Sequence, residues 1–160
     1  MSSARTTMVA WAMVAFGATP AFADLTGFVG ATTTPANRHV QGFALGAGLL
    51  IVGLEFEYGN TPDDPTVLAP ALRTGMGNLL LQTPFPIFGL QPYATTGGGV
   101  YRETLGDRVD TGFALNSGAG VKISLVGPLR LRVDYRVFKL GSKALYSPTH
   151  RVYAGLNLKF

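Results

Sequence analysis

The sequence predicts an all-β protein, an eight-stranded antiparallel up-and-down transmembrane β-barrel, preceded by a cleavable signal peptide. Three observations support this fold class. Apolar and polar residues alternate in eight segments, which is the period of a strand with two different faces. Short turns and longer loops connect the segments in a regular order, as in barrels that cross a membrane. One face of several segments combines glycine with charged residues, which suits a narrow polar interior.

The first 23 residues predict a signal peptide. Arg5 supplies a positive charge, residues 8–17 form an apolar run, and Ala21-Phe22-Ala23 has the A-x-A pattern of a cleavage site. The apolar run is too short to cross a bilayer as a helix. We therefore expect residues 1–23 to be removed and residues 24–160 to form one barrel domain.

Composition excludes several other classes of protein. The chain has no cysteine, so an exported domain of this kind must be stable without disulfides. Beyond the expected signal peptide, no apolar run reaches the length of a membrane-spanning helix. The net charge of +4 comes from basic residues that form no block, which gives no support to nucleic-acid binding.

The expected strands follow one another along the rest of the chain. They cover residues 25–32, 40–49, 51–59, 73–83, 91–103, 112–125, 128–140 and 150–160. Polar loops follow the first, third, fifth and seventh strands, whereas the second and sixth lead into very short turns. The fourth connection is apolar and contains proline. Longer loops on one side, with short turns and both termini on the other, are typical of an up-and-down membrane barrel.

The seventh strand shows the two faces most clearly. Leu129, Leu131, Val133, Tyr135 and Val137 alternate with Arg130, Arg132, Asp134 and Arg136. A soluble, lipocalin-like barrel would bury the apolar row, whereas a membrane barrel presents that row to lipid and turns the charges inward. The second, third and sixth strands favour the membrane barrel, because their inner rows consist of small residues, joined by charges in the third and sixth, and would make a poor apolar ligand cavity. The facing of strand 91–103 stays open, since neither of its rows is clearly apolar.

Aromatic residues near strand ends predict a girdle at the lipid headgroups. We expect it to contain Phe28, Tyr58, Phe113, Phe138 and Phe160. The last strand keeps its alternation up to Phe160, which indicates that it pairs with the first strand and leaves no free edge in the membrane.

The sequence resembles the small outer-membrane β-barrels of Gram-negative bacteria, the OmpA/OmpX-like family, from Leu25 to Phe160. The segments that carry the likeness are GFALGAGLLIVGLEFEYG, PYATTGGGVYRE, NSGAGVKISLVGPLRLRVDYRVF and AGLNLKF. The resemblance implies an outer-membrane location, with outer-membrane lipids, the barrel-assembly machinery and periplasmic chaperones as partners. It also implies that Phe160, with Leu158 and Leu156, forms the signal that the assembly machinery recognises. It does not imply one activity, because the family includes tethers, adhesins, pores and lipid-modifying enzymes.

The densest charged group is expected in the barrel lumen. It consists of Glu55, Glu57, Lys122, Arg130, Arg132, Asp134, Arg136 and Arg151. Arginine pairs well with carboxylates because its planar guanidinium matches their geometry. We interpret the group as a salt-bridged plug in a non-enzymatic protein with a structural or surface-interaction role. The alternative is a narrow passive pore for small solutes, in which the excess of cations would favour anions.

Two histidines are the remaining candidates for chemistry. His39 and His150 are expected in loops, and Ser147 precedes His150 by three residues. A lipid-modifying enzyme would need a nucleophile beside its histidine, but an odd spacing places two residues on opposite faces of a strand. We therefore expect no catalytic site, no metal site and no cofactor. The sequence leaves the oligomeric state open.

Overall fold

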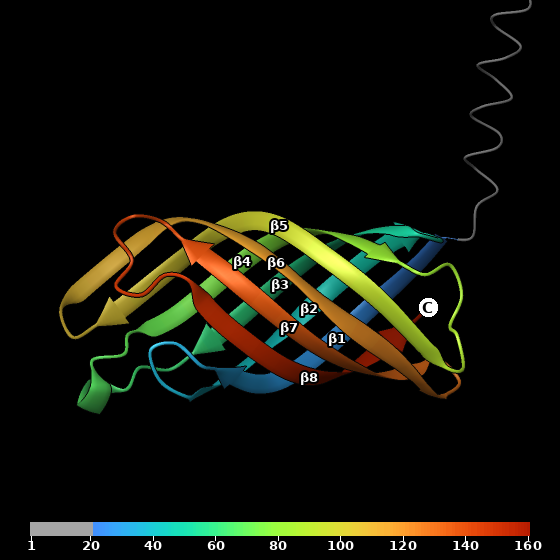
Figure 1. Ribbon diagram of the computed structural model, residues 1–160, viewed down its shortest axis with the longest axis horizontal. Coiled ribbons are helices and arrows are strands. Elements are labelled where there is room, and N and C mark those ends of the chain that lie inside the picture. Colours follow the sequence, from blue (N-terminus) through green and yellow to red (C-terminus); the bar gives the residue numbers. More distant parts are fainter. Residues whose placement is uncertain (1–20) are drawn as a thin grey trace, which may run out of the picture.

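In a computed structural model, which describes residues 21–160, the strands form a closed antiparallel barrel (Figure 1). The strands are β1 (Ala21–Thr32), β2 (Arg38–Leu49), β3 (Val52–Thr61), β4 (Ala71–Gln82), β5 (Leu90–Leu105), β6 (Arg108–Val126), β7 (Leu129–Leu140) and β8 (Thr149–Lys159). A single 3-10 turn, η1 (Pro65–Val67), lies between β3 and β4. Residues 21–160 contain no helix that is long and apolar enough to cross a membrane. The prediction of an all-β fold, an eight-stranded antiparallel up-and-down barrel, is confirmed.

Each strand pairs with its neighbours in the sequence, and β1 pairs with β8 to close the barrel. Ala23 and Phe160 complete this closure, because each backbone N–H donates to the carbonyl oxygen of the other, at 3.0 and 2.9 Å. A closed barrel satisfies the strand hydrogen bonds internally, which a sheet in lipid requires. Of the expected signal peptide, residues 1–20 lie outside the described residues and residues 21–23 begin β1.

One expected loop is wrong. The stretch 104–111 was predicted as a polar loop, but it extends β5 and β6 into a long hairpin with a tight turn at Gly106 and Asp107. Gly106 has a φ of +57°, a backbone conformation that glycine adopts at little cost. The buried Tyr101 hydroxyl also donates to Asp110 at 2.7 Å, which ties the extension together. This hairpin projects at the same end of the barrel as the longer loops (Figure 1).

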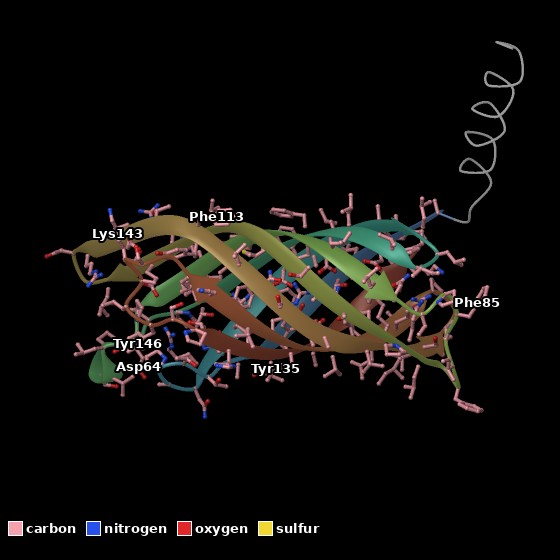
Figure 2. All side chains as sticks on the ribbon, turned by 45° about the horizontal axis from the view of Figure 1, so that its top comes forward. Asp64, Phe85, Phe113, Tyr135, Lys143 and Tyr146 are labelled. Atoms are coloured by element: carbon pink, nitrogen blue, oxygen red, sulfur yellow. The ribbon has the colours of Figure 1, made fainter. Side chains whose placement is uncertain are left out.

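The two faces of the wall follow the predicted alternation. Apolar side chains such as Leu45, which is 51% exposed, project outward along the barrel. Figure 2 shows the labelled Phe113 and Tyr135 on the outside of the wall, while many nitrogen and oxygen atoms lie in the interior. In β5, Tyr93 and Tyr101 face inward and are buried, which answers the question of facing that the sequence left open.

The predicted aromatic girdle is wrong at two positions. Phe28 and Phe138 face the interior and are only 3% and 0% exposed. Each is next to an outward-facing valine, Val29 or Val137, so alternation places its ring inside. The ring of Phe28 stacks on Tyr153 with 4.1 Å between ring centroids. Tyr58, Phe113 and Phe160 lie on the outer side, as expected.

Glycines in β5 allow the neighbouring strand to approach closely. A Cβ atom on Gly99 would overlap the carbonyl oxygen of Gly75, and one on Gly97 would overlap that of Gly77. Both obstacles are backbone atoms of β4, which cannot rotate away as a side chain can. The Gly97-Gly98-Gly99 stretch therefore provides the bending that a small barrel needs.

We expect Gly99→Ala to lower the free energy of unfolding by about 1–3 kcal/mol, because the added methyl group forces the backbones of β4 and β5 apart. The matched control is Gly75→Ala, since a Cβ on Gly75 would meet only Val100 Cγ2, at 3.9 Å. Denaturant titrations of the folded barrel in lipid vesicles measure both. Equal stability of the two variants would contradict the close-approach argument.

Candidate functional site: the charged barrel interior

Eight charged side chains from five strands meet in the middle of the interior. β3 carries Glu55 and Glu57, and β7 carries Arg132, Asp134 and Arg136. β1, β6 and β8 add Asp24, Lys122 and Arg151. Because side chains two residues apart share a face of a strand, the spacing within β3 and β7 brings both sets to the lumen. We call these eight residues the lumen network.

The centre of the network joins β3 to β7 across the barrel. Arg132 pairs with Glu55, with 3.1 Å between Nη2 and Oε1 and a closer contact through Nη1, and its Nε lies 2.6 Å from Asp134 Oδ2. Arg136 contacts three carboxylates. Its Nη2 lies 2.9 Å from Glu55 Oε1, its Nη1 lies 3.1 Å from Glu57 Oε2, and its Nε lies 3.3 Å from Asp134 Oδ1. Glu55 and Asp134 are therefore each shared by two arginines.

Two peripheral pairs extend the network along the barrel axis. Towards the loops, Arg151 Nη1 lies 3.3 Å from Glu57 Oε1, and its guanidinium carbon is 4.4 Å from the centroid of the Phe138 ring. Towards the turns, Lys122 Nζ lies 2.7 Å from Asp24 Oδ2. The inward position of Phe138 thus has a role, since an aromatic face attracts a cation.

Tyrosine hydroxyls add hydrogen bonds to two of these carboxylates, Glu57 and Asp134. The Tyr153 hydroxyl donates to Glu57 Oε2 at 2.8 Å. The Tyr93 hydroxyl donates to Asp134 and accepts from Arg132 Nε at 2.7 Å. Carboxylates removed from water need such partners, because a buried charge is costly unless it is paired and hydrogen-bonded.

The lumen network is electrically balanced. Its four cations, Lys122, Arg132, Arg136 and Arg151, face four carboxylates, Asp24, Glu55, Glu57 and Asp134. No paired side chain is more than 3% exposed. This balance differs from the excess of cations that the sequence suggested.

Two residues account for the difference. Arg130 was expected in the charged group, but it lies outside the network, half-buried, and its Nη1 donates to Gln91 Oε1 at 2.8 Å. Asp24 was not expected in the group, and it precedes the first expected strand, 25–32. Its place on the polar row of the first strand, two residues before Thr26, was the signal that pointed to the lumen.

Two loops are tied to the wall at the loop end of the lumen. Glu103 Oε2 accepts a hydrogen bond of 2.9 Å from the backbone N–H of Leu145, in the loop between β7 and β8. The guanidinium of Arg38 donates to the carbonyl oxygen of Pro62 at 3.1 Å and so holds a second loop.

The residues considered for catalysis are not brought together. Ser147 Oγ accepts from the backbone N–H of Leu140 at 3.0 Å, while His150 Nδ1 lies 2.7 Å from the Tyr135 hydroxyl on the outer side. His39 was expected in a loop but lies in β2, and His150, expected where the last loop meets the strand at 150–160, lies in β8. This correction reflects the strand ends, which extend one or two residues beyond the alternation that predicted them.

The proposed assembly residues share the outer face of β8. Leu156, Leu158 and Phe160 are exposed, and Phe160 is 68% exposed. Its backbone nevertheless pairs with Ala23. The terminal residue is therefore part of the sheet through its main chain, while its ring is free to contact lipid or another protein.

A closed eight-stranded barrel with an apolar outer surface and a charged interior is the fold of the small β-barrels of bacterial outer membranes. No protein-family model and no curated protein matches the sequence. Solved structures do match. The N-terminal β-barrel domain of Pseudomonas aeruginosa OprF aligns with a TM-score of 0.66 and 17% identity, over 87% of this chain and 97% of that one.

Two further solved structures have the same fold. Neisserial surface protein A aligns with a TM-score of 0.65 and 16% identity, over 88% of this chain and 96% of that one. The outer-membrane enzyme PagL aligns with a TM-score of 0.54 and 16% identity, over 84% of this chain and 98% of that one. At such low identity these likenesses establish the fold and leave the activity open, since an enzyme is among them.

Proposed function

We propose that this protein is a non-enzymatic, non-conducting outer-membrane barrel that serves a structural or surface-interaction role. The observation that carries the proposal is the balanced lumen network, whose charged side chains are buried and paired with one another across the barrel. Side chains alone are enough to fill the interior of an eight-stranded barrel. An ion that crossed this lumen would have to separate these pairs.

The two alternatives have less support. A pore selective for anions was suggested by an excess of arginine, but each cation of the network faces a carboxylate. A lipid-modifying enzyme would need an activated nucleophile, and the Ser147 hydroxyl is hydrogen-bonded to the backbone of Leu140 rather than to His150.

Planar-bilayer recording tests the proposal directly. The refolded wild-type chain is expected to give no conductance steps above those of a boiled sample of the same preparation. Discrete steps whose frequency rises with the amount of folded protein would overturn it. The recording is paired with mass spectrometry of lipid A from cells that express the protein, and a change of mass lost in His150→Ala would establish an enzyme instead.

We further propose that Phe160 acts in assembly through its ring. Phe160→Ala keeps the backbone hydrogen bonds to Ala23 and removes only the exposed ring. The variant is expected to refold in vitro like the wild type but to yield less folded barrel in cells, as judged by gel mobility with and without boiling. The matched control is Phe85→Ala, which removes an exposed ring at the same end of the barrel (Figure 2). Equal yields of wild type and Phe160→Ala in cells would contradict the assembly role.

A further inference from the structure

The outward-facing charges of the wall have one sign. Six carboxylates lie on strands, and all of them face the interior: Asp24, Glu55, Glu57, Glu103, Asp110 and Asp134. The outer face carries Arg73 on β4, Arg102 on β5 and Lys139 on β7, each exposed and near the loop end of its strand. The wall therefore presents cations, and no strand carboxylate within residues 21–160, to the leaflet on the loop side.

Arg73 and Arg102 form a pair without a counter-charge. They are register partners on neighbouring strands, and neither makes a salt bridge within residues 21–160. Arg73 Nε instead donates to Asn60 Oδ1 at 3.2 Å, which orients its guanidinium. A hollow of about 310 Å³ lies between the two arginines and is also lined by Ala71 and Thr104. Like charges opposite each other in a sheet are unfavourable, and an anion between them would relieve the repulsion.

Arg73 also lines a second, larger hollow on the outer wall. This groove, of about 930 Å³, begins at β7, crosses β8, β1, β2 and β3 and ends at β4. Its end near the loops is polar. There, Gln41 on β2 lies opposite Asn60 on β3, which lies opposite Arg73 on β4. The next row towards the turns is mainly apolar. Its members are register partners from strand to strand: Tyr58, Phe43, Gly27, Leu156 and Leu131.

A small residue opens the floor of this groove. Gly27 is exposed, and a Cβ atom built on it would meet nothing within 4 Å. Its register partners Phe43 and Leu156 stand on either side. The groove is therefore an apolar channel along the lipid-facing wall, with a guanidinium at the end where lipid headgroups lie.

We propose that Arg73 and Arg102 bind the phosphate of an anionic membrane lipid in the leaflet on the loop side, and that an acyl chain of this lipid lies in the groove over Gly27. Guanidinium groups suit phosphate because they donate two parallel hydrogen bonds to its oxygens. The apolar row supplies the contacts that an acyl chain requires. The site rests on the membrane location in the proposed function, but it does not depend on whether the lumen conducts.

Native mass spectrometry of the folded barrel, released from a nonionic detergent, tests the site. The probe is long-chain phosphatidylglycerol, compared with short-chain phosphatidylglycerol and with inorganic phosphate. The double variant Arg73→Gln with Arg102→Gln is expected to bind the long-chain lipid about tenfold more weakly or worse, because it loses charge-assisted hydrogen bonds. Lys139→Gln, which removes an exposed outer cation beyond the groove, is the matched control and is expected to bind like the wild type.

Gly27→Leu tests the acyl-chain part of the site, because its side chain fills the groove and leaves both arginines in place. It is expected to weaken binding of the long-chain lipid and to leave binding of the short-chain lipid unchanged. All variants are first checked for the gel shift of a folded barrel, so a folding defect is seen separately. Equal lipid binding by the wild type and the double arginine variant, or an equal loss in Lys139→Gln, would overturn the proposal. Binding of inorganic phosphate as strong as that of the long-chain lipid would overturn it as well.

Discussion

Replacement of Arg132 by methionine is expected to lower the free energy of unfolding by about 3–5 kcal/mol. Arg132 is fully buried and pairs with both Glu55 and Asp134. Methionine fills much of the space but leaves Glu55 with one arginine, Arg136, and takes a donor from the Tyr93 hydroxyl. The loss is large because carboxylates that were desolvated on folding are left without their full set of partners.

Arg130→Met is the matched control, since the same change is made two residues earlier on the same face of β7. Arg130 is only half-buried and donates to Gln91, so we expect a loss of about 1 kcal/mol. Both variants are titrated with guanidinium in phospholipid vesicles, with the mobility of unboiled samples as the measure of folded protein. A loss for Arg132→Met no larger than that for Arg130→Met would show that the network contributes little to stability.

Leu45→Arg is expected to lower the free energy of unfolding by about 2–4 kcal/mol, because it places a charge in the lipid-facing band. Leu45 projects outward from β2 between the exposed Phe43 and Leu49, and its register partners Leu25 and Phe56 are also exposed apolar residues. In a soluble barrel the same change would add a charge to a water-exposed surface and would have little effect. This prediction therefore separates a membrane barrel from a soluble one.

The control for depth is Gln41→Arg, on the same face of β2 and four residues closer to the loops. Gln41 is exposed and pairs with Asn60 at the polar end of the strand, so we expect a loss of about 1 kcal/mol or less, as at an interface. The same vesicle titrations measure both variants. Equal losses at the two depths would contradict the position of the apolar band.

Much of the fold was predictable because its signals are local. Alternation with a period of two is a property of neighbouring residues, so it identified eight strands and the facing of Leu45, Glu55 and Arg132. The errors arose where local signals compete. Phe28 and Phe138 were assigned to the girdle by their aromatic character, although their parity placed them inside. The β5–β6 hairpin contains Gly106 and Asp107, and these turn residues suggested a longer loop than the structure has.

The candidate site was predictable in composition and not in arrangement. Seven of its eight members were recognisable as inward-facing charges: Glu55, Glu57, Lys122, Arg132, Asp134, Arg136 and Arg151. Their pairing depends on which strands face each other across the lumen, and Arg136 meets Glu55 from a distance of 81 positions in the sequence. Such pairs follow from the closure and stagger of the whole barrel, which no local pattern encodes.

The sequence by itself determined the approximate strands, their number and, for all but strand 91–103, which row of side chains faces outward, because the surroundings of each face select its residues one by one. The tertiary structure alone decided that Asp24 balances Lys122, that Phe138 lies beneath Arg151, and that Arg73 and Arg102 stand side by side on the outer wall. Each of these contacts joins residues from different strands, either inside the lumen or as register partners in the wall. Charges act over distances in space, so their effect is set only when the closed barrel fixes which of them are neighbours.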